Sequence, residues 1–165
     1  MKNDKIQLKY FVSYAHKADK LVQDFLDKFH DHASTNPKYT FKKWIDRDII
    51  IGESWDSQIQ TQIDECDFGL LLLTPSFFAR DYIINKELPN FIKKDDDGNI
   101  EIVKSMVPVG LEYFNLGDDL LGLEQTQIYL HQVGLEKKFY DQLRGNKRNE
   151  FVADLLKGMS LKFDS

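Results

Sequence analysis

The sequence predicts an α/β fold in which a parallel sheet carries helices on both faces. Segments with strand character and segments with helical spacing alternate along the 165 residues, a pattern typical of βαβ units. The central segment, Phe68–Leu73, is a continuous apolar run, as expected for a strand that is buried on both faces. The length corresponds to one domain, so we expect a single domain over residues 1–165.

The other elements follow from local patterns. Short apolar or alternating stretches predict further strands over residues 10–12, 39–45, 102–109 and 127–130. Apolar side chains spaced three or four residues apart predict amphipathic helices that include residues 21–29, 55–66, 84–91 and 151–156. Thr74 and Pro75 end the central strand, and Glu87 lies in the helical segment that follows it.

Composition and charge exclude several classes of function. The formal net charge of −5 argues against attraction to nucleic acid or to an anionic membrane surface. No stretch approaches the roughly 20 apolar residues of a membrane span, and the first residues do not resemble a signal peptide. Cys66 is the single cysteine, so no disulfide can form within the chain. We therefore expect a cytoplasmic protein that binds neither nucleic acid nor membrane directly.

Common cofactor motifs are missing from the sequence. Neither G-x-G-x-x-G nor G-x-x-x-x-G-K-[ST] occurs, so neither glycine-rich phosphate loop is predicted. The histidines do not have the spacing of metal ligands, and we expect neither a metal nor a bound cofactor: His16, His30, His32 and His131. A receiver domain would need acidic residues after the first and central strands, where this chain has Ser13–Tyr14 and Thr74–Pro75.

The carboxyl ends of parallel strands are where ligands bind in such sheets. In this chain those positions are Ser13–Lys17, Asp46–Arg47 and Thr74–Ser76, together with the helices that follow them. Glu87 could act there as a reagent, or it could be an exposed helix residue paired with Lys86 or Arg80. The sequence pattern alone leaves both interpretations open.

Four stretches in order resemble a TIR (Toll/interleukin-1 receptor) domain of the bacterial, NAD-cleaving kind. They are YFVSYAHKADK at 10–20, WIDRDIIIGESW at 44–55, the I-x-x-x-I-x-x-C-D-F run at 59–68, and LLLLTPSFFARDYIINKEL at 70–88. The resemblance is good over residues 10–92 and rests beyond them on length and alternation. It implies a flavodoxin-like, three-layer fold with a five-stranded parallel sheet.

The resemblance also implies an activity. Many bacterial TIR domains cleave NAD+ at the nicotinamide–ribose bond, giving nicotinamide and ADP-ribose or a cyclic isomer, often as an anti-phage response. By position, the resemblance assigns the catalytic role to Glu87. It assigns substrate contacts to Ser13, Tyr14, His16, Lys17, Trp44, Asp46, Arg47 and Tyr82. Many members place an aromatic residue four positions before the glutamate, but Tyr82 lies five before Glu87, a spacing that another bacterial group shares.

A lone carboxylate suits this chemistry. Cleavage of an N-glycosidic bond builds positive charge on the ribose, as in glycoside hydrolysis, and nicotinamide leaves as a neutral group that needs no general acid. One carboxylate beside the ribose can offset the developing charge. The other residues could instead have purely structural roles. Ser13 could cap its loop, His16 and Lys17 could lie in a solvated turn, and Asp46 could form an Asx-turn.

Three consecutive isoleucines in a predicted loop, Ile49–Ile51, indicate either burial under the loop or a contact with another molecule. In the family this loop, with the glycine that follows it (Gly52 here), mediates side-by-side assembly, so the resemblance implies other TIR domains as partners and a fused or separate sensor module. Two other functions stay open. One is a non-catalytic adaptor that only binds other TIR domains; the other is an enzyme like the nucleoside deoxyribosyltransferases, which share the architecture and a glutamate.

Overall fold

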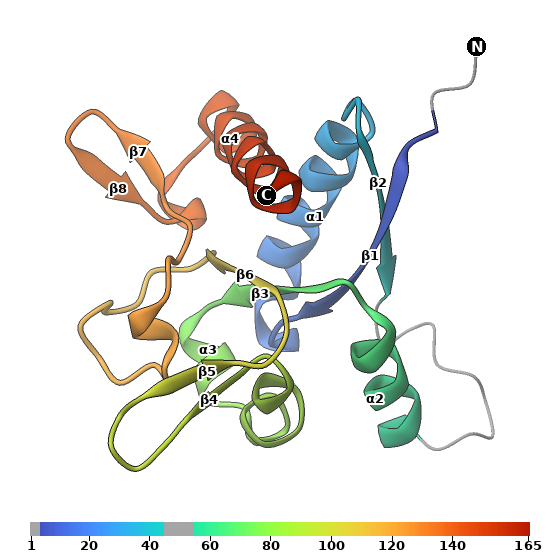
Figure 1. The fold of residues 1–165 in the computed structure, drawn as a ribbon. Coiled ribbons are helices and arrows are strands. Elements are labelled where there is room, and N and C mark those ends of the chain that lie inside the picture. The colour runs from blue at the N-terminus through green and yellow to red at the C-terminus, as the bar shows by residue number, and fades with distance from the viewer. Residues whose placement is uncertain (1–3, 45–54) are drawn as a thin grey trace.

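The computed structural model describes residues 4–44 and 55–165 and contains a parallel four-stranded sheet with the strand order β2-β1-β3-β6 (Figure 1). The strands of this sheet are β1 (Ile6–Ser13), β2 (Tyr39–Trp44), β3 (Phe68–Leu73) and β6 (Met106–Gly110). The sheet confirms the predicted α/β fold class. The bounds of β3 are those that its continuous apolar run predicts, because all six of its residues are buried.

Four α-helices and two small hairpins complete the described architecture. The helices are α1 (Asp19–Ala33), α2 (Trp55–Glu65), α3 (Pro75–Phe78) and α4 (Asn146–Asp164). The hairpins are antiparallel pairs of three-residue strands, β4 (Ile92–Lys94) with β5 (Ile100–Ile102) and β7 (His131–Val133) with β8 (Glu136–Lys138). Within residues 4–44 and 55–165, no helix combines the length and apolarity that crossing a bilayer requires.

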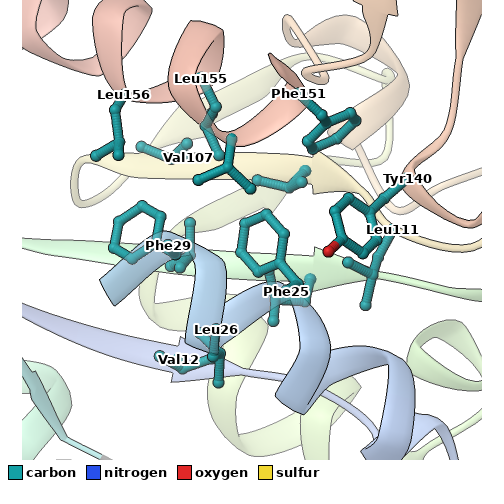
Figure 2. Packing of buried hydrophobic residues seen from close by; sticks show 14 of the residues in the cluster. Val12, Phe25, Leu26, Phe29, Val107, Leu111, Tyr140, Phe151, Leu155 and Leu156 are labelled. Carbon is teal, nitrogen blue, oxygen red and sulfur yellow. The ribbon is translucent and has the colours of Figure 1, made fainter. Parts of the chain in front are cut away.

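The sheet separates two hydrophobic cores, because successive side chains of a strand point to opposite faces. In β3, Phe68, Leu70 and Leu72 enter one core, and Leu71 and Leu73 enter the other. Figure 2 shows the first core, in which α1 and α4 cover the sheet with phenylalanine and leucine side chains. The second core lies beneath α2, α3 and the segment that contains Glu87. The carboxyl ends of β1 and β3 are thereby held by rigid packing on both faces.

The predicted fifth strand is the main correction to the fold. Residues 127–130 do not form a strand; Tyr129 makes only an isolated parallel bridge to Val109. Tyr129 N–H donates to the Pro108 carbonyl, and Gly110 N–H donates to the Tyr129 carbonyl. Pro108 occupies the next donor position on the same edge of β6 and has no N–H, so the ladder cannot extend past this bridge.

Two other segments differ from their predictions. The strand expected over 102–109 is divided: Ile102 ends the β4–β5 hairpin, and β6 begins at Met106. The short last helix expected around 151–156 is the 19-residue α4. Its buried stripe continues from Phe151 and Leu155 to Met159, so the helix extends well beyond the predicted residues.

Candidate active site

The chain after β3 brings Glu87 back toward the end of the sheet. Thr74 is the N-cap of α3 and its side chain accepts a hydrogen bond from Phe77 N–H at 3.0 Å, while Pro75 begins the helix. The helical segment predicted to include residues 84–91 is present, but it is not a continuous α-helix. Instead, residues Ile83–Glu87 form a π-helical turn, and Leu88–Asn90 form a 3-10 turn that contains Pro89. Proline lacks the N–H that a continuing α-helix would need, which accounts for the break.

Glu87 is buried and hydrogen-bonded. Its side chain is among the few charged groups with almost no exposure, at 6%. The Ser13 hydroxyl, at the carboxyl end of β1, donates to Glu87 Oε1 at 2.6 Å, and Ser13 is itself 1% exposed. A hydrogen bond from a hydroxyl to a carboxylate is strong and directional. The contact therefore fixes one oxygen of Glu87 against β1, and the competing interpretation of an exposed helix residue is wrong.

A cavity of about 220 Å³ lies beside this carboxylate. The described residues that line it come from the end of β1 and from the chain after α3: Val12, Tyr14, Ala15, His16, Arg80, Tyr82, Ile83 and Glu87. The rings of Tyr14 and His16 contact one another, with centroids 5.1 Å apart. The volume is below the roughly 300–1,000 Å³ of pockets that enclose a whole drug-sized ligand. It suits a base with its ribose better than an entire dinucleotide.

The π-turn explains how an aromatic residue five positions before the glutamate can line the same cavity. Leu88 N–H donates to the Ile83 carbonyl, the five-residue interval that defines π-helix. In an α-helix, side chains four apart share a face, whereas the wider π-turn brings residues five apart to one side. Tyr82 and Glu87 therefore both reach the cavity. The π-turn accommodates the one extra residue between Tyr82 and Glu87 relative to the commoner spacing of four.

The structure brings some of the predicted substrate contacts together and not others. Tyr14, His16 and Tyr82 line the cavity with Glu87, while Ser13 lies behind the carboxylate. Lys17 is exposed in the 3-10 turn after β1 and is not part of the lining. Trp44 ends β2, but its side chain lies outside the described structure. The same holds for the whole of Asp46, Arg47, Ile49, Ile50, Ile51 and Gly52.

Arg80 is a charged lining residue that sequence reasoning missed as a site residue. It is exposed, and it forms no ion pair with any acid among the described residues. The sequence offered Arg80 only as a partner for Glu87, and that pairing is not formed. Its place between α3 and Tyr82, in the loop that leads to the glutamate, was the signal that could have indicated a role at the cavity.

Cys66 is not a candidate nucleophile. Burial raises the pKa of its thiol, and the sulfur donates to the Ile63 carbonyl at 3.1 Å. A thiol that is harder to deprotonate is a poorer nucleophile, and this one belongs to the core beneath α2. Cys66 does not line the cavity beside Glu87.

Comparison with known families agrees with this arrangement. A family model described as TIR domain matches residues 11–144. The chain belongs to the TIR domain family. A search of curated proteins finds no match. The family match extends past residues 10–92, where the resemblance of the sequence is good, and it includes β6 and both hairpins of this TIR domain.

Membership of the family indicates the general function of the chain but not its specific activity. TIR domains interact with other TIR domains, and the family includes enzymes that cleave NAD+. In this TIR domain the cavity, the buried glutamate and the aromatic lining all lie within the matched residues.

Proposed function

We propose that this TIR domain is an NAD+ glycohydrolase or ADP-ribose cyclase, with Glu87 as the catalytic carboxylate. The observation that carries the proposal is the placement of Glu87: a carboxylate that is 6% exposed, hydrogen-bonded by Ser13 and lining a cavity with aromatic walls. Burial of a carboxylate is unfavourable for folding, a single hydrogen bond offsets that cost only in part, and such buried groups are concentrated at functional sites. An enzyme that stabilises a cationic sugar supplies such a function.

The reaction needs little beyond this carboxylate. The bond between the ribose C1′ and the nicotinamide nitrogen breaks, and its electron pair leaves with nicotinamide, which becomes neutral. The ribose becomes an oxocarbenium-like cation, and Glu87 stabilises it electrostatically and orients its hydroxyls. Water then adds to C1′ and loses a proton, giving ADP-ribose, or a nucleophilic oxygen or nitrogen of the same molecule adds and gives a cyclic isomer.

The remaining lining residues fit the rest of the substrate. The rings of Tyr14 and Tyr82 can hold a flat base, as aromatic side chains do through stacking. Arg80 and His16, at the more exposed part of the lining, can face the diphosphate, since guanidinium groups recognise phosphate with two parallel hydrogen bonds. Because the cavity is small, we assign it to the nicotinamide and its ribose, and the adenosine half extends outside it.

Ser13 acts in this scheme by orienting Glu87 rather than by contacting substrate, because its hydroxyl is buried and already donates to the carboxylate. Lys17, Trp44, Asp46 and Arg47 remain proposed contacts for the part of NAD+ outside the cavity. We further propose that the domain is active when assembled with other copies through Ile49–Ile51 and Gly52, and that a sensor module controls this assembly in anti-phage defence.

The test is turnover of NAD+ by the purified domain over a range of protein concentrations, with products identified by mass spectrometry. Release of nicotinamide, increasing more than linearly with protein concentration, supports both the reaction and the need for assembly. An adaptor domain would release none at any concentration. Parallel incubation with deoxynucleosides tests the third function, because a deoxyribosyltransferase-like enzyme would exchange their bases and leave NAD+ intact.

A further inference from the structure

Helix α2 is hydrogen-bonded at two points to residues 82–90, the segment that contains Glu87. At the first, the Tyr82 hydroxyl donates to Oδ1 of Asp56, in the first turn of α2, at 3.0 Å. This bond joins residues 26 positions apart in the chain. It links the helix that follows residues 45–54 to an aromatic residue that lines the cavity.

The second connection lies one turn further along α2. Gln60 Nε2 donates to Oδ1 of Asn90 at 3.0 Å. The Asn90 side-chain amide in turn donates to the carbonyls of Lys86 and Glu87, at 2.7 and 3.1 Å. In an α-helix the Glu87 carbonyl would accept from Phe91 N–H, but that N–H donates to Leu88 instead. Asn90 therefore replaces a backbone donor that the 3-10 turn removes, and Gln60 holds Asn90 in place.

Tyr82 borders two hollows, which gives its hydrogen bond a mechanical consequence. It lines the cavity with Glu87 and also a second hollow of about 250 Å³ against α2, which is lined by Asp56, Ser57, Ile59, Gln60, Tyr82 and Lys86. Open space beside a side chain lets its ring move, so each hydrogen bond of the Tyr82 hydroxyl restricts that movement. The bond to Asp56 ties the hydroxyl to α2, and this limits where the ring can lie at the cavity wall.

We propose that Asp56 is a positioning residue: by holding the Tyr82 hydroxyl, it sets the aromatic wall of the cavity and makes the geometry beside Glu87 depend on the position of α2. The proposal rests on the proposed function for its effect on turnover. A displacement of α2 moves Tyr82 through Asp56 and the backbone at Glu87 through Gln60 and Asn90. The site is thereby sensitive to whatever contacts the amino-terminal end of α2.

The experiment compares Asp56→Ala with Asp56→Asn and with the control Glu65→Ala. Glu65 is an exposed acid at the other end of α2, so its replacement changes the charge of the same helix without touching Tyr82. Asp56→Asn keeps an oxygen that can accept from the Tyr82 hydroxyl. We expect Asp56→Ala to raise the KM for NAD+ by about 2- to 10-fold, the effect of losing one hydrogen bond, with a smaller change in kcat. Asp56→Asn should restore the parent KM.

A second measurement does not depend on turnover. The ring signals of Tyr82 in NMR spectra of protein with ¹³C-labelled tyrosine, assigned by Tyr82→Phe, should shift or broaden in Asp56→Ala and not in Glu65→Ala. If the parent releases no nicotinamide, the proposed function is lost, and the ring signals alone decide whether Asp56 holds Tyr82. Ring signals in Asp56→Ala identical to those of Glu65→Ala would overturn the inference. So would a KM that is equal in Asp56→Ala and the control.

Discussion

Replacement of Ser13 by alanine isolates the contact on which the geometry of the site depends. In the parent, Ser13 and Glu87 are both almost fully buried and share a hydrogen bond of 2.6 Å to Glu87 Oε1. The change removes this bond and leaves the carboxylate buried. A hydrogen bond to a charged group contributes about 1.5–3 kcal/mol. For a domain of this size that corresponds to a fall in Tm of roughly 3–12 °C. Loss of this bond also weakens the orientation of the carboxylate toward the ribose, and kcat should fall roughly 10- to 150-fold.

The assay pairs thermal unfolding with nicotinamide release for the parent, Ser13→Ala and Ser105→Ala. Ser105 is a half-buried serine whose hydroxyl makes no hydrogen bond within the described residues, so it controls for loss of a hydroxyl group. In a Glu87→Gln background, Ser13→Ala should cost clearly less than in the parent, because the charged partner is gone. If Ser13→Ala matched Ser105→Ala in both Tm and kcat, the reasoning about this contact would be refuted.

Three further predictions concern the π-turn before Glu87, the stability of the domain in acid, and the packing of the central strand β3. Deletion of the exposed Asn85 should convert the π-turn to an α-turn and preserve nicotinamide release, whereas an alanine inserted after it should abolish release. Burial raises the pKa of Glu124, but hydrogen bonds from Lys94 and backbone amides outweigh this and lower it to about 2, below its ordinary 4.5. The stability that Glu124 contributes is therefore complete above pH 4.5 and lost as the pH falls toward 2, so the Tm difference from Glu124→Gln should be largest at neutral pH and shrink in acid. Gly69→Ala would place a Cβ 2.5 Å from the Phe91 ring and should destabilise the domain by about 1–3 kcal/mol or more in urea unfolding.

The parts of the fold that the sequence predicts are those with strong periodicity. The strand Phe68–Leu73 is predicted to the residue, because a six-residue apolar run that ends at Thr74 and Pro75 is typical of a strand buried on both faces. The hairpins β4–β5 and β7–β8 have strands of three residues, too short to show alternation. The length of α4 was present in the sequence as a stripe that continues to Met159, but the glycine at 158 and the charged residues around it obscured it.

The sequence named several residues that line the cavity, but it did not indicate their contacts. The alternation of strands and helices places Ser13 and Glu87 at the same edge of the sheet, yet only the fold shows that one donates to the other across 74 positions. The spacing of five between Tyr82 and Glu87 indicated an anomaly, and its cause, a π-turn before Pro89, depends on backbone geometry that residue patterns do not reveal. Asp56 carried no signal in the sequence, because its partner is set by the packing of α2.

The most direct test is release of nicotinamide from NAD+ by the parent, Glu87→Gln and the control Glu101→Gln, each at the highest concentration at which it stays folded. Glu101 is exposed in the β4–β5 hairpin and does not line the cavity, so its replacement should leave release unchanged. We predict release by the parent and by Glu101→Gln, and none above background from Glu87→Gln with its fold verified by circular dichroism. Equal release from a folded Glu87→Gln would contradict the assignment of the catalytic carboxylate.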